Sequence, residues 1–171
     1  MTIELIPVDT TGLAEAWDNW IEFIATSHHG SDSRTNPGDA FTPLTKPLSD
    51  SKVALLTTAG AHLDDQKPFH VETVAGDPTH RILPDDLDTS RLRFTHTHYD
   101  TSSAEIDPNC VFPIDRLHEL VESGRLGSAS PVHVGMMGFN PNPGPIQDEL
   151  GPAVAEILKD AEVDVALLVP G

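Results

Sequence analysis

Residues 53–58, VALLTT, form a short run that is apolar on both faces and ends at Ala59 and Gly60. A run of this kind is typical of a strand that is covered on two sides, as in a parallel sheet. We therefore expect an α/β protein in which the strand at residues 53–58 belongs to the sheet.

Further strands and helices follow this run in alternation. We expect a strand at residues 91–98, a helix that starts at Pro113 and closes at Gly124, a strand at 131–137, a helix at 152–161 and a strand at 163–169. Such alternation predicts a mostly parallel sheet with right-handed crossovers.

The residues before the first strand divide into a helix and a loop. Leu13, Trp17 and Ile24 recur at helical spacing and predict an amphipathic helix over residues 11–26. Residues 30–51 are rich in Ser, Pro, Asp and Gly and predict a long irregular loop, in which Phe41 and Leu44 pack on the core. We expect a single α/β domain over residues 1–171.

Composition excludes several classes of partner. The 171 residues carry 10 Lys and Arg against 27 Asp and Glu, a formal charge of −17. Nucleic acid and anionic membranes are therefore disfavoured, because both require clustered cations. The sequence shows neither a long apolar run nor a signal peptide, so we expect a cytoplasmic protein. The single cysteine fits a reducing compartment.

The predicted architecture places a binding site at one edge of the sheet. Ligands of open α/β sheets bind outside the carboxyl ends of the strands. Here those ends are residues 57–62, 96–100, 135–138 and 169–171, and we expect them to converge. Thr58, Gly60 and Tyr99 are the expected contacts to a small-molecule substrate.

Residues 96–100, HTHYD, are the densest set of chemically useful side chains. His96 and His98 lie on one face if the predicted strand continues, and neutral imidazole is the commonest zinc ligand. With His62 they form a candidate site for a divalent metal, and Asp100 is a third ligand or a hydrogen-bond acceptor. Catalysis as general acid or base without a metal is the second interpretation. The third is structural, with one histidine in the core and the other at the rim.

Cys110 and Arg116 are weaker candidates. Cys110 follows an expected turn at residues 107–110 and could be a nucleophile, although a buried, inert thiol is favoured. Arg116 could bind a substrate carboxylate, although pairing with Asp115 or Glu119 is favoured in so acidic a chain.

Several separated strings resemble the selenoprotein B family of glycine, sarcosine, betaine and D-proline reductases. They are LLTTAGAH at 55–62, QKPF at 66–69, FTHTHYD at 94–100, DPNCVFPIDRL at 107–117 and GRLG at 124–127. The resemblance implies a flavodoxin-like fold and the reductive cleavage of a C–N bond. It also implies catalytic roles near the strand ends for His96, His98 and Asp100.

One feature departs from the family pattern. The family uses a selenocysteine or cysteine in a (Sec or Cys)-x-x-Cys motif just after a strand like residues 165–171, and the sequence stops at Gly171. We expect either a chain truncated before that motif or a protein that lacks it. A final strand without a covering helix also predicts that a partner subunit, a second protomer or a missing segment covers the exposed sheet face there.

Three hypotheses about function remain open at this point. The first is a reductase of this family, and the second is a metal-dependent protein built on His62, His96 and His98. The third is a non-catalytic subunit whose partner supplies the chemistry. The acidic surroundings are expected to raise the pKa of the three imidazoles and to favour cations.

Overall fold

The computed structural model describes residues 42–72 and 76–171. The chain divides into two compact units, Met1–Pro43 and Leu44–Gly171, and the fold below is that of the second unit. The predicted helix at 11–26 and Phe41 lie outside the described residues. A single domain over the whole chain therefore stays a prediction.

The main sheet is built around β1 (Lys52–Thr57), as its apolar pattern predicted. β5 (Ser128–Ala129), β6 (Val132–Met136) and β7 (Val165–Val169) all pair with β1 in parallel. β3 (His80–Pro84) pairs with β6 in the opposite direction and was not predicted. The expectation of a mixed α/β protein with a mostly parallel sheet is confirmed.

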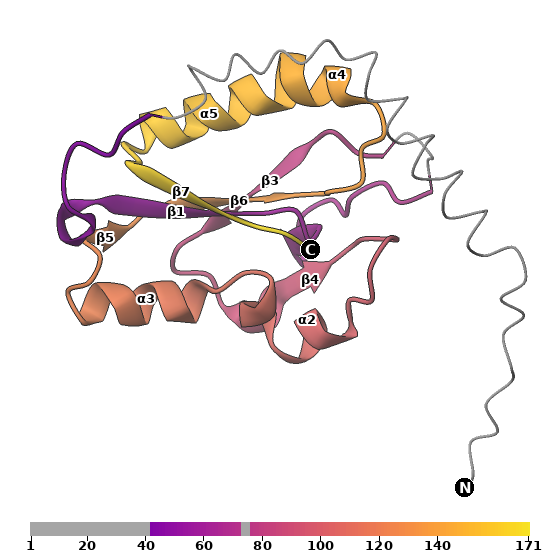
Figure 1. Ribbon diagram of the computed structural model, residues 1–171. Helices are drawn as coiled ribbons and strands as arrows, with labels where there is room; N and C mark the ends of the chain where they lie inside the picture. Colours follow the sequence, from indigo (N-terminus) through magenta and orange to yellow (C-terminus); the bar gives the residue numbers. More distant parts are fainter. Residues whose placement is uncertain (1–41, 73–75) are drawn as a thin grey trace, which may run out of the picture. The chain divides into compact units, whose positions relative to one another are not determined.

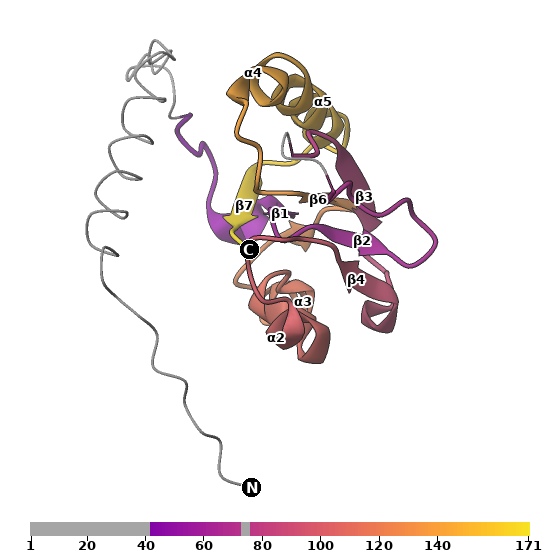
Figure 2. The ribbon, with the colours of Figure 1, turned by 90° about the vertical axis from the view of Figure 1, so that its right-hand side faces the viewer.

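Helices cover the sheet on two faces, as Figures 1 and 2 show. α3 (Ile114–Glu122) lies on one face, and α5 (Gly151–Asp160) lies on the other. Both agree with the predicted helices within one or two residues. The shorter elements are α2 (Ser102–Ile106), α4 (Pro143–Pro145), the π-helical turn η4 (Ile146–Leu150) and the 3₁₀ turns η1 (Leu48–Asp50), η2 (Thr89–Arg91) and η3 (Pro108–Cys110). In residues 42–72 and 76–171 no helix has the length and apolar character needed to cross a membrane.

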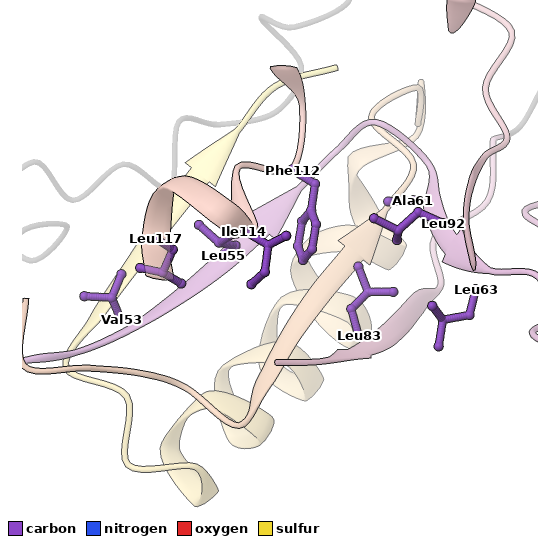
Figure 3. Close-up of a cluster of buried hydrophobic side chains, with 9 residues drawn as sticks. All are labelled: Val53, Leu55, Ala61, Leu63, Leu83, Leu92, Phe112, Ile114 and Leu117. Carbon is purple, nitrogen blue, oxygen red and sulfur yellow. The ribbon is translucent and has the colours of Figure 1, made fainter. Parts of the chain in front are cut away.

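The main core lies between the sheet and α3. Phe112 is fully buried at its centre, among Leu55 and Leu83 from the sheet and Ile114 and Leu117 from α3 (Figure 3). Burying a side chain of this size contributes about 1.5–3 kcal/mol. A second cluster, with Leu56 and Val154 as members, holds α5 against the opposite face.

His133 takes the place of a backbone hydrogen-bond partner on one side of β1. β7 pairs with Val53–Thr57 on the other side. On the side of His133, β5 pairs with the start of β1 and β6 with its end, and the register against β1 changes between them, at Ser130 and Pro131. There the Leu55 N–H donates to Nδ1 of His133 at 3.0 Å. His133 is fully buried, and its Nε2–H donates to Asp85 at 3.0 Å. The imidazole therefore completes the hydrogen bonding of the central strand.

The predicted strand at residues 91–98 is wrong in length and in pairing. β4 covers only Leu92–Phe94 and pairs antiparallel with β2 (Ala61–Leu63), in a separate two-stranded sheet. The reason lies at Gly60, whose φ of +71° turns the chain from β1 into β2. The register of β2 and β4 therefore ends at Ala61 and Phe94, and residues 95–98 continue as a loop that keeps one backbone bond, from the Thr95 N–H to the Gly60 carbonyl.

Exposed leucines test two predictions, one about Leu44 and one about the final strand. Leu44 is 43 % exposed, so the prediction that it packs on the core is wrong. Within residues 42–72 and 76–171, β7 pairs with β1 alone. Leu167 and Leu168 on β7 are 48 % and 66 % exposed, which fits the predicted uncovered strand.

Candidate functional site

The predicted strand ends meet at one edge of the sheet, beside the carboxyl end of β1. Thr58 is their common neighbour: its N–H donates to the Val169 carbonyl at 3.1 Å, and its carbonyl accepts from the Gly138 N–H at 2.8 Å. The Thr58 hydroxyl also accepts from the Gly171 N–H at 3.2 Å. The convergence inferred from the sequence is therefore present, and we call this region the strand-edge site.

The loop after β4 reaches the same edge through Gly60. The Thr95 N–H donates to the Gly60 carbonyl at 3.0 Å. A Cβ atom on Gly60 would overlap the Thr95 carbonyl oxygen, and the positive φ of Gly60 adds strain for any other residue. Gly60 thus acts through its backbone, by letting the histidine-bearing loop approach β1.

Aromatic contacts hold the loop of residues 96–100 in place. The His98 ring stacks on Phe139, with ring centroids 3.5 Å apart and planes 13° from parallel. The His96 ring lies 4.9 Å from the Tyr99 ring. The Tyr99 hydroxyl donates to the Ala59 carbonyl at 2.9 Å, which ties the loop to the residue after Thr58.

The hydrogen bonds of the two histidines define what each can offer a ligand. Nδ1 of His96 accepts from the His98 N–H at 3.0 Å, so in neutral His96 the proton lies on Nε2. Nδ1 of His98 shares a hydrogen bond of 2.8 Å with the Thr97 hydroxyl. His98 is an exposed residue, so its side chain is accessible from solvent.

Burial shifts the pKa values of two side chains of this loop. It lowers the pKa of His96, and the nearby His98 lowers it further. For His96, the expectation of a raised imidazole pKa is therefore wrong, because burial outweighs the acidic surroundings. Burial also raises the pKa of Tyr99 to about 12, and Cys110 and Glu105 contribute in the same direction. Both groups are therefore neutral near pH 7 and can donate hydrogen bonds.

A cavity of about 300 Å³ lies beside Thr58 at this edge. Its walls are mainly apolar, from Met136, Met137 and Ile146, and Asn140 adds a polar group. The wall opposite the sheet includes the π-helical turn, an irregularity frequent at functional sites. A small, partly apolar molecule would fit this space.

Two predicted site residues, His62 and Asp100, are held by hydrogen bonds to other residues of the chain. His62 is buried in β2, where its Nδ1 bonds to the Leu63 carbonyl and its Nε2 to the Thr95 hydroxyl, both at 2.8 Å. Asp100 accepts from the Ser102 N–H at 3.0 Å at the start of α2, and this bond lowers its pKa. Both side chains stabilise the ends of the histidine-bearing loop.

The geometry does not support the metal hypothesis. His62 has both ring nitrogens occupied, and His96 has one. Over the part of the chain that the structure describes, no group of three or more His, Cys, Asp or Glu side chains could hold a metal ion.

The favoured prediction is wrong for Cys110 and confirmed for Arg116. Cys110 is exposed, so the favoured buried thiol is wrong, and it is close enough to Tyr99 to affect the pKa of its hydroxyl. The turn expected at residues 107–110 is confirmed, with Asp107 accepting from the Asn109 N–H. Arg116 pairs with Glu119 at 2.8 Å, as favoured from the sequence.

Phe139, which supports His98, and Asn140, which lines the cavity, were not predicted from the sequence. The only signal for either was their position just after a predicted strand end. His133 was not predicted either, and its signal was a histidine within an otherwise apolar strand.

Comparisons with known proteins place most of the chain in one family. The family model described as glycine/sarcosine/betaine reductase selenoprotein B matches residues 33–170. The D-proline reductase subunit gamma of Acetoanaerobium sticklandii is 36 % identical over 135 residues, which are 79 % of this chain and 54 % of that protein.

A second relative is the glycine reductase complex component B subunit gamma of Symbiobacterium thermophilum. It is 30 % identical over 129 residues, which are 74 % of this chain and 30 % of that protein. The chain therefore spans about half, or less, of the length of these curated relatives. No solved structure matched the chain significantly.

Proposed function

Because the chain belongs to the glycine/sarcosine/betaine reductase selenoprotein B family, we propose that it is a component of a reductase complex acting on a small amino-acid-like substrate. The reaction is the reductive cleavage of a C–N bond. The observation that carries the proposal is the convergence of the family-like strings at 55–62 and 94–100 at the strand-edge site, around Thr58 and Gly60.

The strand-edge site would bind and orient the substrate. The neutral His96 offers an Nε2–H, and His98 offers an accessible ring. Tyr99 fixes the loop through its bond to Ala59, and the cavity beside Thr58 accepts an apolar part of the substrate. These residues position the substrate, and either histidine could act as a general acid.

The electrons of the reaction come from outside this sequence. Breaking a C–N bond reductively uses two electrons and two protons, and yields one C–H and one N–H bond. Cys110 is the single cysteine, so it has no second thiol with which to form a disulfide. We therefore assign the electrons to a thiol or selenol pair that the sequence does not contain.

The exposed edge strand supports a partner subunit. The side chains of β7 are exposed at Leu167 and Leu168, and a nearly apolar groove of about 230 Å³ lies beside Leu167, between β7 and α3. A second copy of this chain is disfavoured as the occupant, because a formal charge of −17 on each copy opposes self-association. We propose another subunit of the reductase complex, which extends the sheet beside β7. The flavodoxin-like arrangement and the cytoplasmic location stay predictions.

The proposal is tested by activity of the assembled complex. The chain is purified from its source through an affinity tag, and dithiol oxidation is followed with glycine, sarcosine, betaine or D-proline as substrate. We expect one of the four to drive thiol consumption. D-proline would give one ring-opened product with two additional hydrogens, whereas each acyclic substrate would give a carbon fragment and an amine that each gain one hydrogen, and mass spectrometry detects these products. An assembled complex that oxidises no dithiol with any of them would contradict the proposal.

The partner surface has its own test. Leu168→Lys places a charge on the exposed side of β7, whereas Ile106→Lys changes an exposed leucine-sized side chain, 86 % exposed, on α2. We expect the first variant to lose the co-purifying subunit and the second to keep it. Equal recovery with both variants would exclude β7 as the contact.

A further inference from the structure

A larger cavity, of about 700 Å³, lies outside the strand-edge site. It opens between β4 and α2, which are neighbours in Figures 1 and 2. Phe94, Ala104 and Ile106 are apolar residues of its wall. His62 and Thr95 line the same cavity and are hydrogen-bonded to each other. The cavity therefore combines space for an apolar group with a hydroxyl that is bonded to an imidazole.

The direction of the bond between Thr95 and His62 follows from the other ring nitrogen. Nδ1 of His62 lies 2.8 Å from the Leu63 carbonyl oxygen, which can only accept, so Nδ1 carries a proton. In the neutral ring Nε2 is therefore an acceptor, and the Thr95 hydroxyl donates to it at 2.8 Å. This is the arrangement of a hydroxyl nucleophile and its general base, in which a third group orients the base.

The backbone holds both partners in this geometry. His62 lies opposite Arg93 in the ladder of β2 and β4, and the Thr95 N–H extends the ladder by donating to the Gly60 carbonyl at 3.0 Å. His62 is 4 % exposed, so its ring is shielded from water, whereas Thr95 is partly exposed. The hydroxyl can therefore meet a substrate in the cavity while the base behind it stays fixed.

Arg93 places a positive charge beside the hydroxyl and the imidazole. Side chains alternate along a strand, so Arg93 and Thr95 lie on one face, which is also the face that carries His62 on β2. Arg93 lines the cavity too, and its Nη1 donates to the Ser90 and Leu92 carbonyls at 2.9 and 2.7 Å. A guanidinium fixed in this position can stabilise negative charge that develops on a carbonyl oxygen.

We propose that this cavity is a catalytic site separate from the strand-edge site, at which Thr95 accepts the acyl group of a small ester. His62 is the general base, and Arg93 stabilises the oxyanion of the tetrahedral intermediate. The apolar wall accommodates the hydrocarbon part of the acyl group. The inference goes beyond the proposed function, because acyl transfer involves no oxidation or reduction.

The acyl group is transferred in two steps. In the first, Oγ of Thr95 bonds to the ester carbonyl carbon and its proton passes to Nε2 of His62. The ester C–O bond then breaks, the alcohol leaves with that proton, and the acyl group stays on Thr95. In the second step, water attacks the acyl carbon and gives a proton to His62, which returns it to Oγ as the carboxylic acid leaves. Ester and water thus yield acid and alcohol.

The test is acetylation of the full chain by p-nitrophenyl acetate. Absorbance follows the release of p-nitrophenolate, and tandem mass spectrometry of the acid-quenched, digested chain identifies the acetylated residue. We expect a burst of p-nitrophenolate and an acetyl group on Thr95. A chain in which Thr95 stays unmodified would overturn the inference, whether or not other side chains are acetylated.

Paired variants assign the roles of the three residues. Thr95→Val removes the hydroxyl at nearly constant volume, and Thr45→Val does so at an exposed position outside the cavity. We expect the first to lower the rate of the burst at least about a hundredfold and the second to leave it unchanged. His62→Gln should lose a similar factor, whereas His70→Gln, at an exposed position outside the cavity, should not. Arg93→Gln should lower the rate at least about tenfold.

A further variant separates catalysis from folding. Thr95→Ser keeps a hydroxyl that can donate to His62, so we expect acetylation at position 95 to persist. Urea unfolding shows which variants are folded. A folded Thr95→Val that releases p-nitrophenolate as fast as wild type, or a folded Thr95→Ser that is not acetylated at position 95, would exclude Thr95 as the nucleophile.

Discussion

His133→Phe should strongly destabilise the fold while leaving the shape of the core intact. The phenylalanine ring can keep the edge-to-face contact that His133 makes with Phe112, with centroids 5.8 Å apart. It cannot accept from the Leu55 N–H or donate to Asp85, which His133 does at 3.0 Å each. The substitution therefore removes two hydrogen bonds and little packing.

The magnitude follows from the burial of each partner. The Leu55 N–H has no access to water, and an unpaired buried donor costs about 1–3 kcal/mol. Asp85 loses one charge-assisted bond, but its side chain is 31 % exposed, so water replaces part of it. We expect a net loss of about 2–4 kcal/mol in the free energy of unfolding. His118→Ala removes the other bond to the same Asp85 oxygen from a side chain that is 40 % exposed, and should cost less than about 1 kcal/mol.

Urea unfolding at two pH values provides the assay. Burial, the largest cause, lowers the pKa of His133 below 6.5, and His118 lowers it too, whereas Asp85 raises it. Below pH 6.5 the unfolded chain thus binds more protons than the folded one, so this part of the stability is lost as the pH falls. The difference in the free energy of unfolding between wild type and His133→Phe should therefore become smaller as the pH falls from about 7.5 to about 5.5. A loss below about 1 kcal/mol, or no larger than that of His118→Ala, would show that His133 does not complete the hydrogen bonding of β1.

Three further predictions concern the strand-edge site. Gly60→Ala should unfold the chain or lower the free energy of unfolding by about 3 kcal/mol or more. Gly124 has a similar φ of +69° but open space around it, so Gly124→Ala should lower the free energy of unfolding by only about 1–2 kcal/mol, and urea unfolding measures both losses. Tyr99 is the only tyrosine, so absorbance titration of the native chain should give a midpoint near 12, against about 10 in urea. The stability that depends on this shift is lost as pH rises through that range, and a native midpoint near 10 would contradict the raised pKa. Histidine NMR titration should give His96 a pKa below 6.5 and a proton on Nε2 in the neutral ring, and the opposite tautomer would exclude the bond from the His98 N–H.

The part of the fold that the sequence predicted depends on local patterns. The apolar run at 53–58 and the stripe of Ile114 and Leu117 have buried faces that depend only on their own spacing, and both elements formed where expected. β4 was predicted too long because alternation continues through His98, whereas pairing stops where β2 turns at Gly60. That limit is set by a distant segment, which no local pattern contains.

In the strand-edge site too, some features follow from sequence patterns and others depend on contacts between distant residues. The convergence at Thr58 followed from strand order, which alternation of elements predicts. The contacts of Phe139 with His98 and of Asp85 with His133 join residues more than forty positions apart, and only the folded chain brings them together. The roles of His62 and Asp100 also changed, because Thr95, 33 positions from His62, takes one of its ring nitrogens and the nearby Ser102 donates to Asp100.

The most direct test of the strand-edge site is the steady-state kinetics of the assembled complex with His98→Ala. His70→Ala, an exposed histidine outside the site, is the matched control. We expect His98→Ala to lower kcat/KM for dithiol-dependent substrate cleavage by at least about tenfold, while the variant still assembles and His70→Ala is unaffected. Equal kcat/KM for wild type and both variants would contradict it.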